Sequence, residues 1–124
     1  MDVNPRAAAT AIVLACGALM WATAALAHAF PEREEPGVGA VVRETPKQVR
    51  IWFNAKLEPV FSTVFVEDAD GKRISGASRV DPDSLDMVEA PLQPLDAGKY
   101  HVYWKVVARD GHRTEGDYTF AVGP

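Results

Sequence analysis

The chain has 124 residues with 13 basic and 17 acidic side chains, which gives a formal net charge of −4, and it contains a single cysteine. This length suits one small domain. The mild acidic balance, without a basic patch, argues against nucleic acid as a partner and does not repel a metal cation.

The N-terminal segment has the composition of a secretory signal peptide. Residues 7–27 carry no charge and are dominated by alanine. They end in Ala25-Leu26-Ala27, which matches the A-x-A pattern of a signal-peptidase site. We therefore expect residues 1–27 to be removed and residues 28–124 to form the mature, secreted domain. The segment carries one acidic and one basic residue, so its removal leaves the net charge unchanged.

Two other fates of this segment stay open. About 20 apolar residues can also span a bilayer as an uncleaved anchor. Val13-Leu14-Ala15-Cys16 resembles a lipoprotein box with Cys16 as the lipidated residue, although the apolar run continues past this cysteine. Because Cys16 is the only cysteine, the domain from residue 28 onward can form no internal disulfide and offers a metal no thiolate.

The rest of the chain favours short strands over helices, because apolar residues alternate with polar ones and glycine and proline are frequent. We expect strands at 38–43, 48–53, 60–67, near Ile74, around Met87-Val88, at 100–109 and at 115–122. This pattern predicts an all-β fold, a seven-stranded antiparallel Greek-key β-sandwich of the immunoglobulin-like type. We interpret the charged run at 32–35 as a solvated loop rather than a cation site.

The expected strand at 100–109 has two faces of different character. Its core face consists of Tyr100, Val102, Trp104, Val106 and Ala108. Its other face carries His101, Tyr103, Lys105 and Arg109. Since neighbouring side chains of a strand point to opposite sides, Trp104 should pack in the core and His101 should face solvent. The alternative is that His101 is a third imidazole ligand for a metal.

Two separate pieces of the sequence offer metal ligands. Asp110 and His112 are spaced i, i+2, which puts both on one face of an extended segment, where they can bind a transition metal or form an ordinary loop hydrogen bond. After cleavage, His28 would carry a free α-amine beside its imidazole. The amine and two imidazoles form a three-nitrogen set that suits Cu(II), whereas zinc prefers a tetrahedron. We expect one Cu(II) per chain at His28, Asp110 and His112.

Several motifs spread over the mature chain are shared with one known family. They include His28-Ala29-Phe30, Val49-Arg50-Ile51-Trp52-Phe53, Gly98-Lys99-Tyr100-His101-Val102-Tyr103-Trp104, Asp110-Gly111-His112 and Gly116-Asp117-Tyr118-Thr119-Phe120. In these motifs the chain resembles the CopC family of periplasmic copper-binding proteins. The resemblance implies a seven-stranded Greek-key sandwich with a Cu(II) site of the histidine-brace kind. It assigns the brace to the amine and ring of His28 and the ring of His112, with Asp110 as the carboxylate.

Two departures from the family pattern narrow what the resemblance implies. Some members carry a further glutamate ligand just after the second strand, where this chain has Ala55. Some members also carry a methionine-rich loop that holds Cu(I), but the matching region at 75–88 contains only Met87. The resemblance is therefore to the Cu(II)-only branch of the family.

The expected function is copper resistance, copper homeostasis or delivery of copper to a membrane transporter, without enzymatic activity. The resemblance implies a partner of the CopD type in the inner membrane. The chain ends at Pro124 with no further apolar span, so we expect that partner to be separate and membrane contact to be limited to the uncleaved signal. Two alternatives stay open: a copper-dependent oxidative enzyme built on a histidine brace, and a metal-free immunoglobulin-like binding module. The sequence has no G-x-S-x-G nucleophile elbow.

Overall fold

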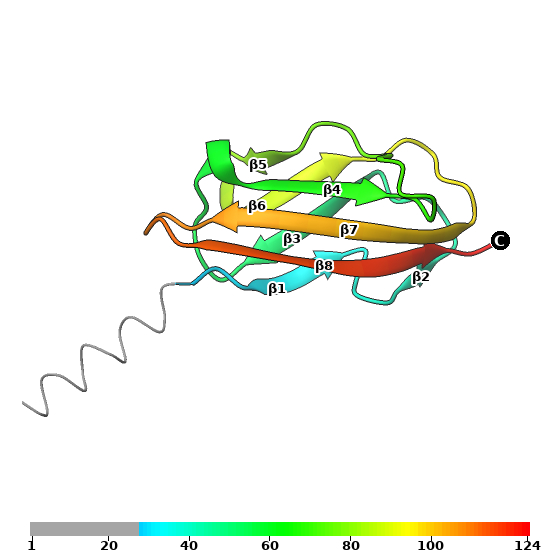
Figure 1. The fold of residues 1–124 in the computed structure, drawn as a ribbon, viewed down its shortest axis with the longest axis horizontal. Coiled ribbons are helices and arrows are strands. Elements are labelled where there is room, and N and C mark those ends of the chain that lie inside the picture. The colour runs from blue at the N-terminus through cyan, green and yellow to red at the C-terminus, as the bar shows by residue number, and fades with distance from the viewer. Residues whose placement is uncertain (1–27) are drawn as a thin grey trace, which may run out of the picture.

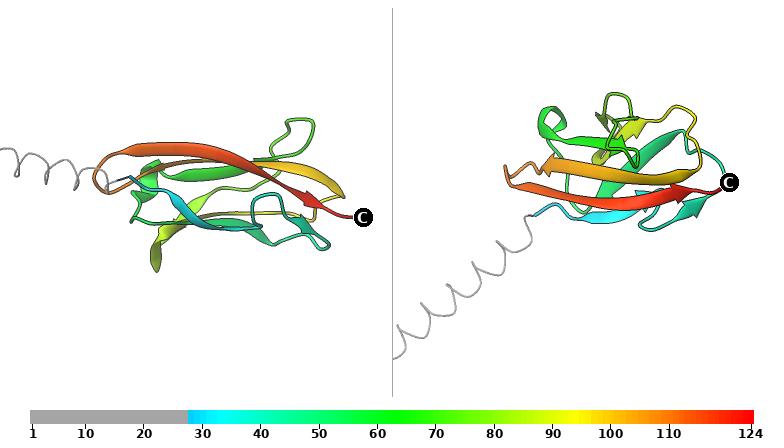
Figure 2. Two further views of the ribbon diagram at one scale, coloured as in Figure 1. Left: turned by 90° about the horizontal axis from the view of Figure 1, so that it is seen from below. Right: turned by 45° about the vertical axis from the view of Figure 1, so that its right-hand side comes forward.

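In the computed structural model, which describes residues 28–124, two four-stranded sheets pack face to face (Figures 1 and 2). The strand order is β1-β3-β6-β5 in one sheet, called the β3 sheet, and β2-β8-β7-β4 in the other, called the β7 sheet. The expected signal segment at 1–27, including Cys16, lies outside the described residues. Within residues 28–124, no helix is long and apolar enough to cross a membrane.

The strands are short at the N-terminal side of the domain and long at its C-terminal side. Their bounds are Pro31–Glu35 (β1), Val41–Val42 (β2), Gln48–Phe53 (β3), Thr63–Glu67 (β4), Arg79–Asp81 (β5), Ser84–Pro91 (β6), Gly98–Val107 (β7) and Arg113–Val122 (β8), with a 3₁₀ turn, η1, at Pro59–Phe61. All pairs are antiparallel except β2 with β8, which is parallel. The predicted β-sandwich is therefore confirmed, with eight strands in place of seven.

Three expected strands differ from the structure for local reasons. Residues 37–40 form a turn, in which the Ala40 N–H donates to the Gly37 carbonyl at 3.1 Å, so only Val41 and Val42 of the first expected strand pair with β8. The strand expected at 60–67 begins at Thr63 because η1 occupies the preceding residues.

The segment near Ile74 was predicted to be a strand, which is wrong. Arg73 bridges Glu67 in the β7 sheet and Ser75 bridges Leu92 beside the β3 sheet. The chain therefore crosses from one sheet to the other at this point and forms a ladder with neither. The strand of this region is β5, which follows at Arg79–Asp81.

The charged run at 32–35 was interpreted as a loop, and this interpretation is wrong. It belongs to β1, which pairs antiparallel with β3 at the edge of the β3 sheet. The Arg33 guanidinium lies 3.9 Å from the centroid of the Trp52 ring, and it forms an ion pair with Glu35 at 3.2 Å. An edge strand held by backbone pairing and such contacts needs few buried apolar side chains, so its composition resembles that of a loop.

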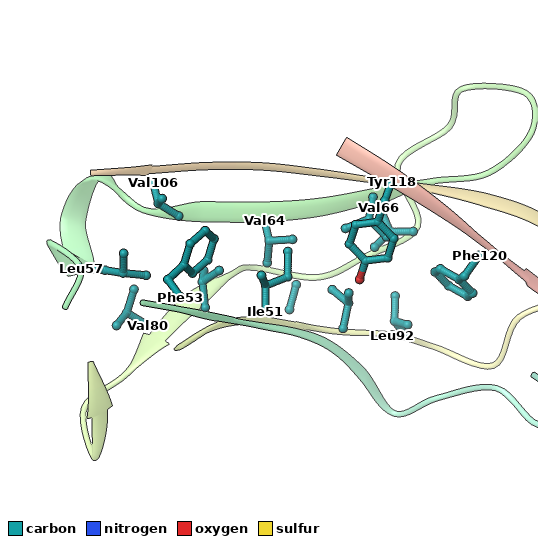
Figure 3. Close-up of a cluster of buried hydrophobic side chains, with 14 of the residues drawn as sticks. Ile51, Phe53, Leu57, Val64, Val66, Val80, Leu92, Val106, Tyr118 and Phe120 are labelled. Carbon is teal, nitrogen blue, oxygen red and sulfur yellow. The ribbon is translucent and has the colours of Figure 1, made fainter. Parts of the chain in front are cut away.

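The core lies between the sheets and includes the predicted face of β7 (Figure 3). Val102 and Val106 are fully buried, and Trp104 is half-buried with its ring edge-to-face on Phe53 at 5.2 Å between centroids. Gly116 lies opposite Trp104 on β8, and a Cβ at this glycine would lie 2.5 Å from Cζ2 of the indole. Glycine at this position therefore makes room for the tryptophan.

Candidate metal centre

The candidate ligands lie at one end of the sandwich, where the β7–β8 turn meets the start of β1 (Figure 1). The turn closes through hydrogen bonds from the Ala108 N–H to the His112 carbonyl at 3.0 Å and from the Gly111 N–H to the Ala108 carbonyl at 2.9 Å. Gly111 has a φ of 88°, a left-handed conformation that side chains with a Cβ rarely adopt. The glycine allows the turn to present Asp110 and His112 at its tip.

Asp110 holds His112 through both of its carboxylate oxygens. Oδ1 accepts the backbone N–H of His112 at 3.0 Å, and Oδ2 lies 3.0 Å from Nδ1 of the same residue. The pKa of Asp110 lies below its ordinary value. The main causes are these two hydrogen bonds, and the nearby imidazoles of His112 and His28 contribute less. Because an ionised carboxylate only accepts hydrogen bonds, Nδ1 is the donor of this pair, and in the neutral imidazole Nε2 then has its lone pair available for a metal.

His28 lies against His112 although 83 residues separate them in the sequence. The two rings stack with centroids 5.1 Å apart and an angle of 25° between their planes, and Phe30 lies 6.1 Å from the His28 ring. The three residues predicted from the sequence therefore come together at one exposed end of the molecule. Among residues 28–124, however, no three His, Cys, Asp or Glu side chains form a preassembled metal cluster.

Two polar side chains that the sequence analysis did not single out anchor the residues directly after His28. The carbonyl of the fully buried Ala29 accepts a hydrogen bond from Thr114 Oγ1 at 2.7 Å. Asn54 accepts the Phe30 N–H through Oδ1 at 2.8 Å, and its own N–H donates to the Phe30 carbonyl at 3.0 Å. Ala55 packs against the core.

His101 does not join the other two histidines. It lies on the outer face of the β7 sheet, toward the opposite end of β7, as its alternation with core residues predicts. Its Nε2 lies 2.5 Å from Asp117 Oδ2 and its Nδ1 lies 3.1 Å from the Tyr103 hydroxyl, so its side chain is only 35% exposed. The structure thus separates His101 from the candidate ligands.

The candidate metal centre is a surface feature rather than a pocket. A surface hollow of about 560 Å³ is lined on its polar side by Glu32, Asn54, Lys56, Asp83 and Asp86. None of the three candidate ligands lines it. An exposed position of this kind gives a metal ion, or a partner protein, direct access to the rings of His28 and His112.

Comparison with known proteins gives consistent matches. Residues 32–123 match the family described as the CopC domain. Copper resistance protein C of Escherichia coli is 33% identical over 116 residues, which cover 86% of this chain and 91% of that protein. Copper transport protein CutJ of Bacillus subtilis (strain 168) is 28% identical over 99 residues, which cover 78% of this chain and 18% of CutJ.

The fold comparison agrees with the sequence comparison. The crystal structure of CopC from Methylosinus trichosporium OB3b superimposes with a TM-score of 0.74 at 30% sequence identity. This match covers 78% of the present chain and 95% of the other. The chain therefore belongs to the CopC family.

Proposed function

We propose that the protein binds one Cu(II) ion in the periplasm, with His28, His112 and Asp110 as the site, and serves copper resistance, homeostasis or delivery. The observation that carries the proposal is the stack of His28 on His112, with Asp110 bonded to Nδ1 of the latter. The names of the matched relatives, a copper resistance protein and a copper transport protein, support copper as the ligand.

The donor set fits Cu(II) in its chemistry. Removal of residues 1–27 would turn the His28 nitrogen from an amide into an amine, so that amine and ring chelate from one residue. His112 adds Nε2, whose lone pair is free because Asp110 binds the other ring nitrogen. Three nitrogens with a nearby carboxylate match the tetragonal nitrogen and oxygen coordination that Cu(II) prefers. Copper here is cargo, held at an exposed end from which it can be passed on.

A membrane transporter of the CopD type is the partner we propose for this transfer. CutJ is named a copper transport protein, and the present chain corresponds to only 18% of it. A CopC-like domain thus occurs in that relative as part of a much longer transport protein. In the present protein, transfer would take place between this domain and such a transporter.

The experiment that tests the site compares two proteins, one that begins at His28 and one with a single alanine before His28. The second keeps every side chain but moves the amine. We expect the first to bind one equivalent of Cu(II) in a calorimetric titration. The second should bind at least tenfold more weakly, which corresponds to about 1.4 kcal/mol. Equal affinity with the same paramagnetic resonance spectrum, or two tight equivalents, would contradict the brace.

The ligand set also predicts selectivity for the oxidised metal. Soft thioether ligands select Cu(I), and Met87, the single methionine among residues 28–124, is 3% exposed. We expect the protein to lose Cu(I) to bicinchoninate while it keeps Cu(II) against a chelator of similar strength. Retention of Cu(I) would point to a second donor set.

A further inference from the structure

The first residues of the mature domain are tied to the sandwich by side-chain hydrogen bonds at two successive positions. Thr114 donates to the Ala29 carbonyl at 2.7 Å, and Asn54 pairs with both the N–H and the carbonyl of Phe30. We propose that Asn54 and Thr114 are positioning residues that form a clamp, which fixes the His28 amine and ring beside His112. This inference rests on the proposed copper site.

The Thr114 arm of the clamp links the two histidines by a short path. Thr114 lies two residues after His112 on β8, and Ala29 is the residue next to His28. One hydrogen bond therefore joins the immediate neighbour of one imidazole to the strand that directly follows the other. Because Ala29 is fully buried, this anchor is partly shielded from water, whereas His28 and His112 are exposed.

The Asn54 arm holds the chain just N-terminal to Pro31, where the regular pairing of β1 with β3 stops. The β1–β3 ladder begins with Pro31 opposite Phe53, and proline has no N–H to donate. Asn54, directly after β3, supplies a side-chain acceptor for the Phe30 N–H and a backbone donor for the Phe30 carbonyl. The chain is thereby held at Phe30, one residue N-terminal to the proline and directly after Ala29.

The clamp matters for metal binding because the ends of protein chains fray unless they are tied down. Without the clamp, the His28 amine and ring would sample many positions, and binding would have to order them. With it, the chain directly after His28 is held and the His28 ring lies beside that of His112, so part of this ordering is done when the protein folds. Removal of either arm should therefore have a larger effect on Cu(II) affinity than on the stability of the sandwich.

The test uses Thr114→Val and Asn54→Ala in the protein that begins at His28. Each should bind Cu(II) about tenfold more weakly than the unaltered protein, equivalent to about 1.4 kcal/mol, with a changed paramagnetic resonance spectrum. Thr114→Ser keeps the donating hydroxyl and should restore both affinity and spectrum. A hydroxyl that contributes only to stability would change the unfolding temperature but not the spectrum of the bound metal.

A matched control lies at the other end of the sandwich. Thr45 Oγ1 also makes two hydrogen bonds, to the carbonyl of Leu95 at 3.2 Å and from its N–H at 2.9 Å. Thr45→Val should lower the unfolding temperature and leave Cu(II) affinity unchanged. The clamp is overturned if both clamp variants bind copper as tightly as the unaltered protein with the same spectrum, or if Thr45→Val loses as much affinity. Failure of the unaltered protein to bind Cu(II) would instead overturn the copper site itself.

Discussion

His112 and His101 each pair with an aspartate, but the two rings differ in how many of their nitrogens have a hydrogen-bond partner. Of the two ring nitrogens of His112, only Nδ1 is hydrogen-bonded to Asp110. The side chain of His112 is 59% exposed, and its ring stacks on a second imidazole. Both ring nitrogens of His101 are occupied, one by Asp117 and the other by the Tyr103 hydroxyl. A histidine–carboxylate pair therefore does not identify a metal ligand unless a ring nitrogen stays free and a further donor lies within reach.

The surroundings of His101 explain why its ring is fixed. It stacks on Tyr103 with centroids 4.2 Å apart, Tyr103 stacks on Phe65 at 5.1 Å, and the Arg73 guanidinium covers the other side of Phe65 at 4.0 Å. The pKa of Tyr103 is raised, mainly by burial and to a smaller extent by the charges of Glu67 and Asp117. The phenol thus keeps its proton and can donate it to the imidazole. This row of rings spans β4 and β7 and packs against one face of the His101 ring.

The largest effect expected from this difference is on copper affinity. His112→Ala removes the free Nε2 and should weaken Cu(II) binding at least 100-fold, about 2.8 kcal/mol at 1.4 kcal/mol per tenfold. His101→Ala should change it less than twofold, although it deletes the same side chain. A competition titration of both variants against one chelator measures the contrast. Equal losses would mean that the two pairs are equivalent.

A second prediction separates damage to the sandwich from damage to the site. Gly116→Ala forces a methyl group to within 2.5 Å of the Trp104 ring, between the two histidine pairs. Such overpacking should lower the free energy of unfolding by about 1–3 kcal/mol while Cu(II) affinity stays the same. Gly37→Ala is the matched control, because a Cβ there meets nothing closer than 3.8 Å. Chemical denaturation of the metal-free proteins provides the measurement; a parallel loss of copper affinity would tie the site to this part of the core.

A third prediction compares the two aspartates. Asp110→Asn removes the charge that orients and polarises His112, and loss of such a partner of a ligating histidine typically lowers metal affinity 10–100-fold. We expect about tenfold, because asparagine can still accept the backbone N–H of His112. Asp117→Asn, made beside His101, should leave Cu(II) affinity unchanged. The same chelator competition tests both, and an effect of Asp117→Asn would show that the outer face contributes to the site.

Much of the fold was readable from the sequence because its long strands alternate strictly. The prediction for β3 at 48–53 matches the structure, and β7 and β8 were placed to within two residues at each end. In these strands one face is buried, so the hydrophobic pattern has period two. In β1 and β5, at the edges of the β3 sheet, pairing with a neighbour holds the strand. Their own sequence carries no such pattern, which is why both were missed.

The residues of the candidate site also fall into two groups, those that could be predicted from the sequence and those that could not. Asp110 and His112 are close in the sequence, and His28 stands out by its place after an apparent cleavage site, so all three could be proposed from local sequence. Asn54 and Thr114 could not, because their roles depend on contacts with Phe30 and Ala29 across 24 and 85 positions. A polar residue at a strand end has many possible partners, and only the fold selects one.

The smallest expected effect is on the pH dependence of stability in the metal-free protein. Because hydrogen bonds from the backbone and ring of His112 lower the pKa of Asp110, the unfolded chain binds more protons than the folded one at acid pH. The resulting stabilisation is fully present above the ordinary aspartate pKa, near 3.9, and is lost as pH falls through the lower folded value. The unfolding temperature of Asp110→Asn should thus lie slightly below that of the unaltered protein from pH 7 to about 5, and in calorimetric scans the gap should narrow as the pH falls below the ordinary aspartate pKa. In a His112→Ala background the backbone hydrogen bond, the largest cause of the shift, remains, so the gap should shrink without disappearing. A gap that widened toward acid pH would have the wrong sign for a carboxylate held in its ionised form.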